Sequence, residues 1–114
     1  MRLFLATVLS AVLLVPLSTL AAASGADGKA LFLENCATCH GEDGKADTEL
    51  GAKYMAADFT SAEWKKEFGG KDAKVKKVIK NGVKGTKMKA WKATLSSAEI
   101  DALAAYVQQL AQGK

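Results

Sequence analysis

The stretch ENCATCHG, residues 34–41, holds the only two cysteines and the only histidine of the 114-residue chain. Cys36, Cys39 and His40 thus place two thiols and one imidazole within five positions. On a helical turn, positions i, i+3 and i+4 share one face, so we expect the three side chains to point the same way. The pattern narrows the candidate sites to a disulfide, a metal ion or a bound cofactor.

Two of these three options fit the sequence poorly. A disulfide between Cys36 and Cys39 would close a very short loop and stabilise little. Such pairs are typical of redox dithiols in thioredoxin-like folds, but the alternating strands and helices of that fold are not predicted here. A structural zinc site normally takes four ligands, and no further Cys or His completes one.

The spacing fits a covalently bound haem. Two thiols can add across the two vinyl groups of a haem, and the imidazole that follows can coordinate the iron. Cys-x-x-Cys-His is a recognised attachment signature for c-type haem. We therefore predict one haem c, attached through thioethers at Cys36 and Cys39, with His40 as the proximal axial ligand of the iron. The second ring nitrogen of His40 is expected to donate to a carbonyl.

Methionine thioethers are the strongest remaining candidates for the other axial position. Met55 lies only 15 residues after His40, whereas Met88 lies 48 residues on, beyond a predicted helix. A chain that wraps the haem can reach its opposite face over that distance. We predict Met88 as the distal axial ligand and Met55 as a core or haem-wall residue.

The first 23 residues are typical of a cleaved secretory signal peptide. A basic start at Arg2 is followed by an apolar stretch over residues 3–15 and by three alanines at residues 21–23. A retained membrane anchor is the alternative, but the apolar stretch is short for a span. We expect residues 24–114 to form a single exported domain in the periplasm, with no membrane span after cleavage.

Helical periodicity is the dominant pattern of the remaining chain. Helices are predicted over residues 27–38, 61–68 and 71–80, and a last one begins at Ser96, whose capping box is completed by Glu99. No alternating strand pattern occurs. We therefore predict an all-α fold of three to four helices. The apolar stripe of the last helix should pack on the first helix and the haem; it comprises Ile100, Leu103, Tyr106, Val107 and Leu110.

The order of these motifs resembles the small bacterial monohaem class I cytochromes c. GKALFLENCATCHG, VIKNGVKGTKMKAW and LSSAEIDALAAYVQQL carry the resemblance, which covers about residues 25–111. It implies helices wrapped around a haem with His and Met ligands, and service as a soluble electron carrier. It also implies a close crossing of the last helix at Gly28, with an aromatic residue at Phe32.

Two departures from that family concern the axial ligands. Lys89 follows Met88, where the family usually has proline, so we expect a less rigid loop here. The family also often has a Gly-Pro segment whose proline carbonyl orients the proximal imidazole, but this chain has GAKYM at residues 51–55. We expect the carbonyl that orients His40 near residues 52–54.

Charge is distributed unevenly along the chain. Residues 24–63 carry three lysines against eight acids, whereas residues 64–92 carry eleven lysines against two acids. Complementary charge accelerates the encounter of redox proteins. We therefore predict that four lysines near Met88 surround a docking surface for an acidic redox partner: Lys84, Lys87, Lys89 and Lys92. Export and the absence of base-reading motifs argue against nucleic acid as a partner.

The functional prediction is a monomeric carrier of one electron between periplasmic redox partners. No acid, base or substrate pocket is evident, so we do not expect an enzyme in its own right, although the chain could be the electron-accepting subunit of one. The alternative is a ligand-binding or peroxidatic haem protein with an open or labile sixth site. Lys89 in place of proline keeps that alternative open.

Overall fold

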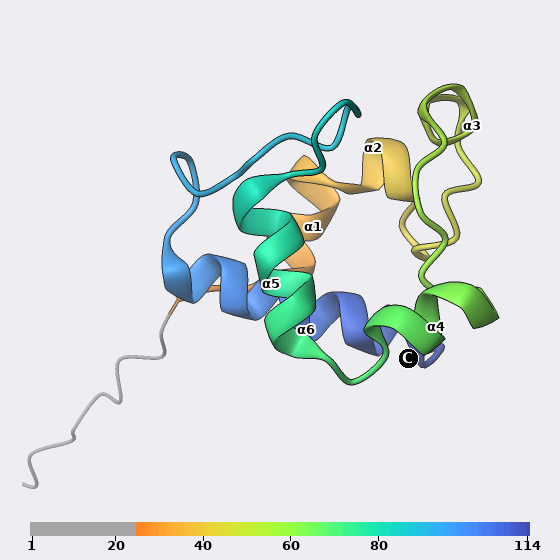
Figure 1. Cartoon of the computed structure of the whole chain (residues 1–114). Coiled ribbons are helices and arrows are strands. Elements are labelled where there is room, and N and C mark those ends of the chain that lie inside the picture. The colour runs from red at the N-terminus through yellow and green to blue at the C-terminus, as the bar shows by residue number, and fades with distance from the viewer. Residues whose placement is uncertain (1–24) are drawn as a thin grey trace, which may run out of the picture.

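The computed structural model describes residues 25–114, and within them all regular structure is helical (Figure 1). The all-α prediction is confirmed, although this part of the chain forms six helical segments rather than three or four. They are α1 (Gly28–Asn35), α2 (Ala37–His40), α3 (Glu49–Tyr54), α4 (Ala62–Phe68), α5 (Asp72–Asn81) and α6 (Ser97–Ala111). The predicted signal peptide lies outside the described residues and stays a prediction.

Local capping explains where the longer helices begin. The Ser96 hydroxyl accepts from the Glu99 N–H at 3.1 Å, and the Glu99 carboxylate accepts from the Ser96 N–H at 2.9 Å, so the predicted capping box of α6 is confirmed. Ser61 caps α4 by accepting from the Trp64 N–H. Glycine determines where α5 ends: the helix stops at Gly82, whose φ of +66° favours glycine.

The first and last described helices cross at a glycine. A Cβ atom at Gly28 would lie 2.3 Å from the carbonyl oxygen of Ala102, so any larger residue would push α1 away from α6. One turn later the Phe32 ring is fully buried and meets the Tyr106 ring edge-on at 5.4 Å between centroids. The predicted packing of the last helix on the first is confirmed.

The hydrophobic core lies between α1, α5 and α6, with Phe59 added from the connection before α4. In Figure 1, α5 passes in front of α6, and the two helices are in contact. Burying each valine, leucine, isoleucine or phenylalanine side chain of this core contributes about 1.5–3 kcal/mol. The buried apolar residues are Phe32, Phe59, Val75, Ile79, Ile100, Leu103, Ala104, Val107, Leu110 and Ala111.

One buried amide ties α6 to the turn between α4 and α5. Gln108 is 7% exposed. Its side-chain nitrogen donates to the Phe68 carbonyl at 2.8 Å, and its side-chain oxygen accepts from the Gly70 N–H at 3.0 Å. Because both backbone groups are satisfied by one side chain, the turn that follows α4 is held in a fixed position on α6.

Candidate haem site

The Cys-x-x-Cys-His motif occupies a single helical turn. The predicted first helix is interrupted at Cys36, where the backbone leaves helical geometry, and α2 then runs from Ala37 to His40. The Cys36 carbonyl accepts from the N–H groups of Cys39 at 3.2 Å and His40 at 2.9 Å. The three candidate side chains, at positions i, i+3 and i+4, therefore come from one turn, as the spacing predicts.

The two cysteines form no disulfide with each other, and each is partly buried. Burial, together with the neighbouring Cys39, raises the pKa of Cys36 to about 11. Redox-active dithiols depend instead on a lowered thiol pKa. The raised pKa of Cys36 is the opposite of what a redox dithiol needs and does not favour the thioredoxin-like alternative.

His40 is held in the orientation that a metal ligand needs. Its Nδ1 lies 3.0 Å from the Ala57 carbonyl oxygen. Since a carbonyl can only accept, Nδ1 carries the proton and Nε2 keeps its lone pair. Burial lowers the pKa of His40, and the hydrogen bond to Ala57 opposes this effect without reversing it. The neutral, Nδ1-protonated imidazole is the form that binds iron through Nε2.

The orienting carbonyl lies further along the chain than the sequence suggested. Residues 52–54, where we expected it, belong to α3 instead. The left-handed conformation of Met55 (φ +55°) ends that helix and turns the chain back towards the motif. The expectation was wrong because α3 was not foreseen.

The two methionines have different environments. Met55 is 89% exposed, so it does not fill the protein core, and its predicted place in the wall of the haem site stays a prediction. Met88 is partly buried in the loop of residues 83–90 that follows α5, here called the Met88 loop. Lys87 of this loop lies over the Tyr54 ring, with 5.7 Å from its amine to the ring centroid. The Met88 loop thereby meets the end of α3, and the ligand role of Met88 stays a prediction.

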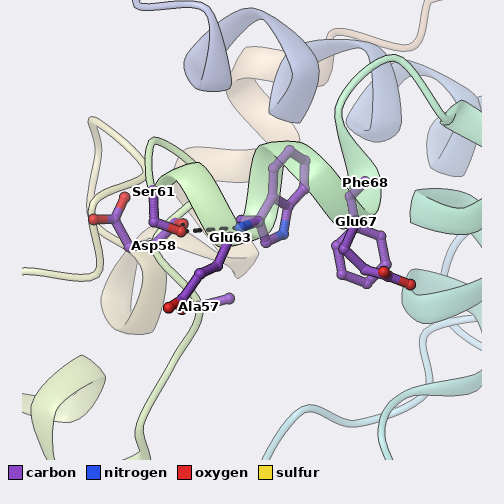
Figure 2. A pocket seen from close by; sticks show the side chains of 7 residues that line it. Ala57, Asp58, Ser61, Glu63, Glu67 and Phe68 are labelled. Carbon is purple, nitrogen blue, oxygen red and sulfur yellow. Dashed lines mark hydrogen bonds between the residues drawn. The ribbon is translucent and has the colours of Figure 1, made fainter.

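A pocket of about 410 Å³ adjoins the carbonyl that holds His40. It extends from Ala57 along α4, and Figure 2 shows the side chains that line it. Trp64, which also lines it, packs against Phe59 at 5.1 Å and against Phe68 at 5.3 Å between ring centroids. The wall of the pocket is therefore aromatic, whereas Asp58, Glu63 and Glu67 add carboxylates to its lining.

The donor set fits a haem c. Two free thiols and a neutral imidazole stand on one turn, and the nitrogen of that imidazole not needed for iron is already engaged. Within the described residues, no group of three or more His, Cys, Asp or Glu forms an alternative metal site. A covalently held planar group also suits a domain with a small core of its own.

Sequence reasoning missed two residues that support the motif. The Thr48 hydroxyl lies 2.8 Å from the Thr38 carbonyl and accepts from the Gly51 N–H at 2.8 Å, so it joins α3 to α2. Its position before Glu49 is a normal helix-cap signal that could have revealed it. Phe59 stacks on the His40 ring at 4.7 Å between centroids, and no sequence pattern indicates that contact.

Comparison with known proteins places the chain in a family. Residues 23–107 match the family described as cytochrome C oxidase, cbb3-type, subunit III. The chain is 42% identical over 99 residues to the cbb3-type cytochrome c oxidase subunit FixP of Azorhizobium caulinodans, and 38% identical over 93 residues to subunit CcoP of Azospirillum brasilense. These alignments cover 87% and 82% of this chain but only 30% of each relative.

A solved structure shows the same fold. The KustC0563 c-type cytochrome is 34% identical, with a TM-score of 0.65 over 74% of this chain and 96% of its own. Because the chain spans about 30% of the length of its curated relatives, it corresponds to one part of those subunits and to nearly all of the small cytochrome.

The relatives overturn two predictions. The first is the prediction of a free monomer that binds acidic partners at Lys84, Lys87, Lys89 and Lys92. It was wrong, because the matching proteins are oxidase subunits. The free periplasmic location was wrong for the same reason. The physical cause is that a cytochrome domain has the same motif, helices and surface lysines whether it diffuses alone or belongs to a complex.

Within residues 25–114, no helix has the length and apolar character needed to cross a membrane. The family match, the c-type cytochrome fold and the arrangement of thiols and imidazole agree on haem c as the cofactor. The chain therefore belongs to the family of the cbb3-type cytochrome c oxidase subunit III, as a small monohaem class I cytochrome c.

Proposed function

We propose that this chain is the haem c module of a membrane-associated complex of the cbb3 oxidase type, which it serves by passing single electrons. The named relatives support this assignment, since they are subunits of such oxidases. c-type cytochromes bind and tune a redox cofactor rather than transform a substrate. The chain is accordingly an electron-transfer component and has no catalytic activity of its own.

In this proposal Cys36 and Cys39 form the thioether bonds, His40 is the proximal ligand and Met88 the distal one. When bound, the haem supplies an iron centre that cycles between ferrous and ferric states, and His/Met ligation raises its reduction potential. The observation that carries the proposal is the hydrogen bond from His40 Nδ1 to the Ala57 carbonyl, because it fixes the tautomer that presents Nε2 to iron.

Spectra of two methionine variants test the distal ligand. The oxidised haem-loaded protein should show the weak sulfur-to-iron band near the red edge of the visible spectrum. Met88→Ala should lose this band, whereas the matched control Met55→Ala should keep it, since Met55 is exposed. A band that survives Met88→Ala and disappears in Met55→Ala would reverse the assignment.

Purification from the native host tests the association with a complex. The tagged full chain, extracted from membranes in mild detergent, should elute with further haem-containing subunits and with oxygen-reducing activity. Recovery of the chain alone from the soluble fraction would contradict the proposed assembly, even if the haem ligation proves correct.

A labile sixth site is the second candidate function. It is favoured by the Met88 loop, because the hydrogen bonds of its residues within the described structure join them only to one another. Carbon monoxide added to the reduced protein distinguishes the two. Rapid binding supports a labile site that takes small ligands, whereas resistance supports electron transfer alone.

A further inference from the structure

The proximal imidazole has an aromatic ring stacked against it. Phe59 and His40 lie 4.7 Å apart between ring centroids, with 22° between their planes. Phe59 is 7% exposed, so its ring also shields that face of the imidazole from water. The contact comes from the segment that supplies the Ala57 carbonyl, two residues earlier in the chain.

The hydrogen bond by itself leaves one motion of the imidazole free. Nδ1 is held at the Ala57 oxygen and Nε2 is directed to iron, but the ring can still turn about the line through these two nitrogens. A flat surface against the ring face opposes that rotation, because any turn separates the stacked planes and loses their contact. The hydrogen bond and the stack are thus complementary restraints on His40.

Phe59 can act in this way because its own position is fixed. Its N–H donates to the Gly44 carbonyl at 2.9 Å. A Cβ at Gly44 would lie 2.9 Å from the Phe59 ring, so the glycine allows the ring to lie against that loop. Its other neighbours are Phe32, edge-on at 6.2 Å between centroids, and Trp64 at 5.1 Å.

The turn around Phe59 adds further rigidity. The Asp58 carboxylate accepts from the Thr60 N–H at 2.8 Å and from the Thr60 hydroxyl at 2.7 Å. These two bonds close an Asx-type turn around Phe59. The ring that touches His40 is therefore fixed through its backbone, its flanking residues and its aromatic neighbours.

We propose that Phe59 is a positioning residue that sets the ring plane of His40 through face-to-face stacking. The inference rests on the proposed role of His40 as axial ligand. The orientation of an axial imidazole governs how unpaired spin is distributed over the haem in the ferric state. The contacts around a ligating histidine are also one of the means by which a protein tunes its metal.

The first test uses the unmodified haem-loaded protein in its reduced, diamagnetic state. Strong ring-current shifts of the His40 ring protons report coordination, and nuclear Overhauser effects from the Phe59 ring to these protons report the stack. Both signals are expected. Unshifted His40 protons would refute the proposed ligand, whereas shifted protons without contacts to Phe59 would refute this inference alone.

The second test compares variants in the oxidised state, where the order and spread of the haem methyl resonances report the imidazole plane. Phe59→Leu should change that pattern and shift the reduction potential, and Phe59→Tyr, which keeps the ring face, should restore both. Phe32→Leu is the matched control, since Phe32 is buried in the same cluster and packs against Phe59 and Tyr106. It should lower the unfolding midpoint and change the methyl pattern far less than Phe59→Leu does, because the backbone bond to Gly44 and the contact with Trp64 still hold the Phe59 ring.

An unchanged methyl pattern in Phe59→Leu would overturn the inference, as would equal changes in Phe59→Leu and Phe32→Leu. If Phe59→Leu yields no haem-loaded protein, Phe59→Met replaces it, because methionine fills the space without offering a flat face. The Overhauser measurement needs no variant and decides the question even if both substitutions prevent folding.

Discussion

The two candidate iron ligands are held in different ways. His40 belongs to a region, residues 36–60, whose hydrogen bonds join separate segments. The Ala57 carbonyl holds its ring, the Ala46 N–H donates to its carbonyl at 2.7 Å, and the Thr48 hydroxyl bonds Thr38 on the same turn. This His40 region is therefore shaped by contacts between elements that lie apart in the sequence.

The Met88 loop is mainly supported by itself. The Val83 N–H donates to the Met88 carbonyl at 2.9 Å, and the Thr86 hydroxyl accepts from the Met88 N–H at 3.1 Å. The Trp91 N–H then returns the chain to the Ile79 carbonyl of α5. The comparison teaches that the fold presets the orientation of His40, whereas Met88 depends on the closure of one local loop.

The largest expected effect on stability comes from replacing a glycine of the His40 region by alanine. A Cβ at Gly51 would lie 2.3 Å from the Ala46 carbonyl oxygen and 2.5 Å from that of Cys39. Gly51→Ala should therefore separate α3 from the motif and lower the free energy of unfolding by about 3 kcal/mol. Urea unfolding of the haem-loaded protein, followed by circular dichroism, measures the loss.

Gly85→Ala in the Met88 loop is the control for that substitution. Gly85 has φ +78° and no atom within 4 Å of an added Cβ, so only backbone strain of about 1 kcal/mol is expected. Equal losses in the two variants would mean that the His40 region is no more tightly packed than the Met88 loop.

Removing one hydroxyl from each region should have smaller and different effects. Thr48→Val leaves the Gly51 N–H without its partner and should cost about 1–2 kcal/mol of unfolding free energy. Thr86→Val removes an exposed bond to the Met88 N–H and should cost only about 0.5 kcal/mol. Its main consequence should be faster carbon monoxide binding to the reduced protein.

The kinetic measurement separates the two threonines. Thr48→Val should bind carbon monoxide as slowly as the unmodified protein, because the loop around Met88 is intact. If Thr48→Val accelerates binding and Thr86→Val does not, the Met88 loop is not the element that controls access to the sixth position.

The smallest effect is the response to mild acid. Burial lowers the pKa of His40 in the folded protein, so below a pH of about 6.5 the unfolded chain takes up a proton that the folded chain resists. The proposed bond from Nε2 to iron acts in the same direction, because it occupies the basic nitrogen of the folded protein, so the free energy of unfolding of the haem-loaded protein should fall between pH 7.5 and 5.5. Urea midpoints measure this, and Met88→Ala should show the same decline because a thioether does not titrate. A constant midpoint over that range would contradict the prediction.

Local signals made much of the fold predictable from the sequence. Ser96 with Glu99 gave the start of α6, and the apolar spacing of Val75 and Ile79 gave α5, because both depend on neighbours within one or two turns. The Cys-x-x-Cys-His motif likewise places its ligands within a single turn. Such features depend on residues that are close in sequence, so they can be recognised without knowledge of the rest of the fold.

Features that depend on distant segments were not predictable in this way. The six-residue helix α3 is too short for a clear periodicity, so the carbonyl for His40 was expected before Ala57. The stack of Phe59 on His40 requires the chain to return from residues 41–58. Membership of an oxidase complex is a property of a larger assembly, which one domain's charges do not encode.

The close crossing at Gly28 also bears on the order in which the protein matures. Its partner Ala102 comes 74 residues later in the chain, so during synthesis α1 is made long before α6 can cover it. The attachment motif follows α1 directly in the chain, so it too precedes α6. The close packing of α6 on α1 can therefore form only after the attachment motif and all the chain that follows it up to Ala102 have been made.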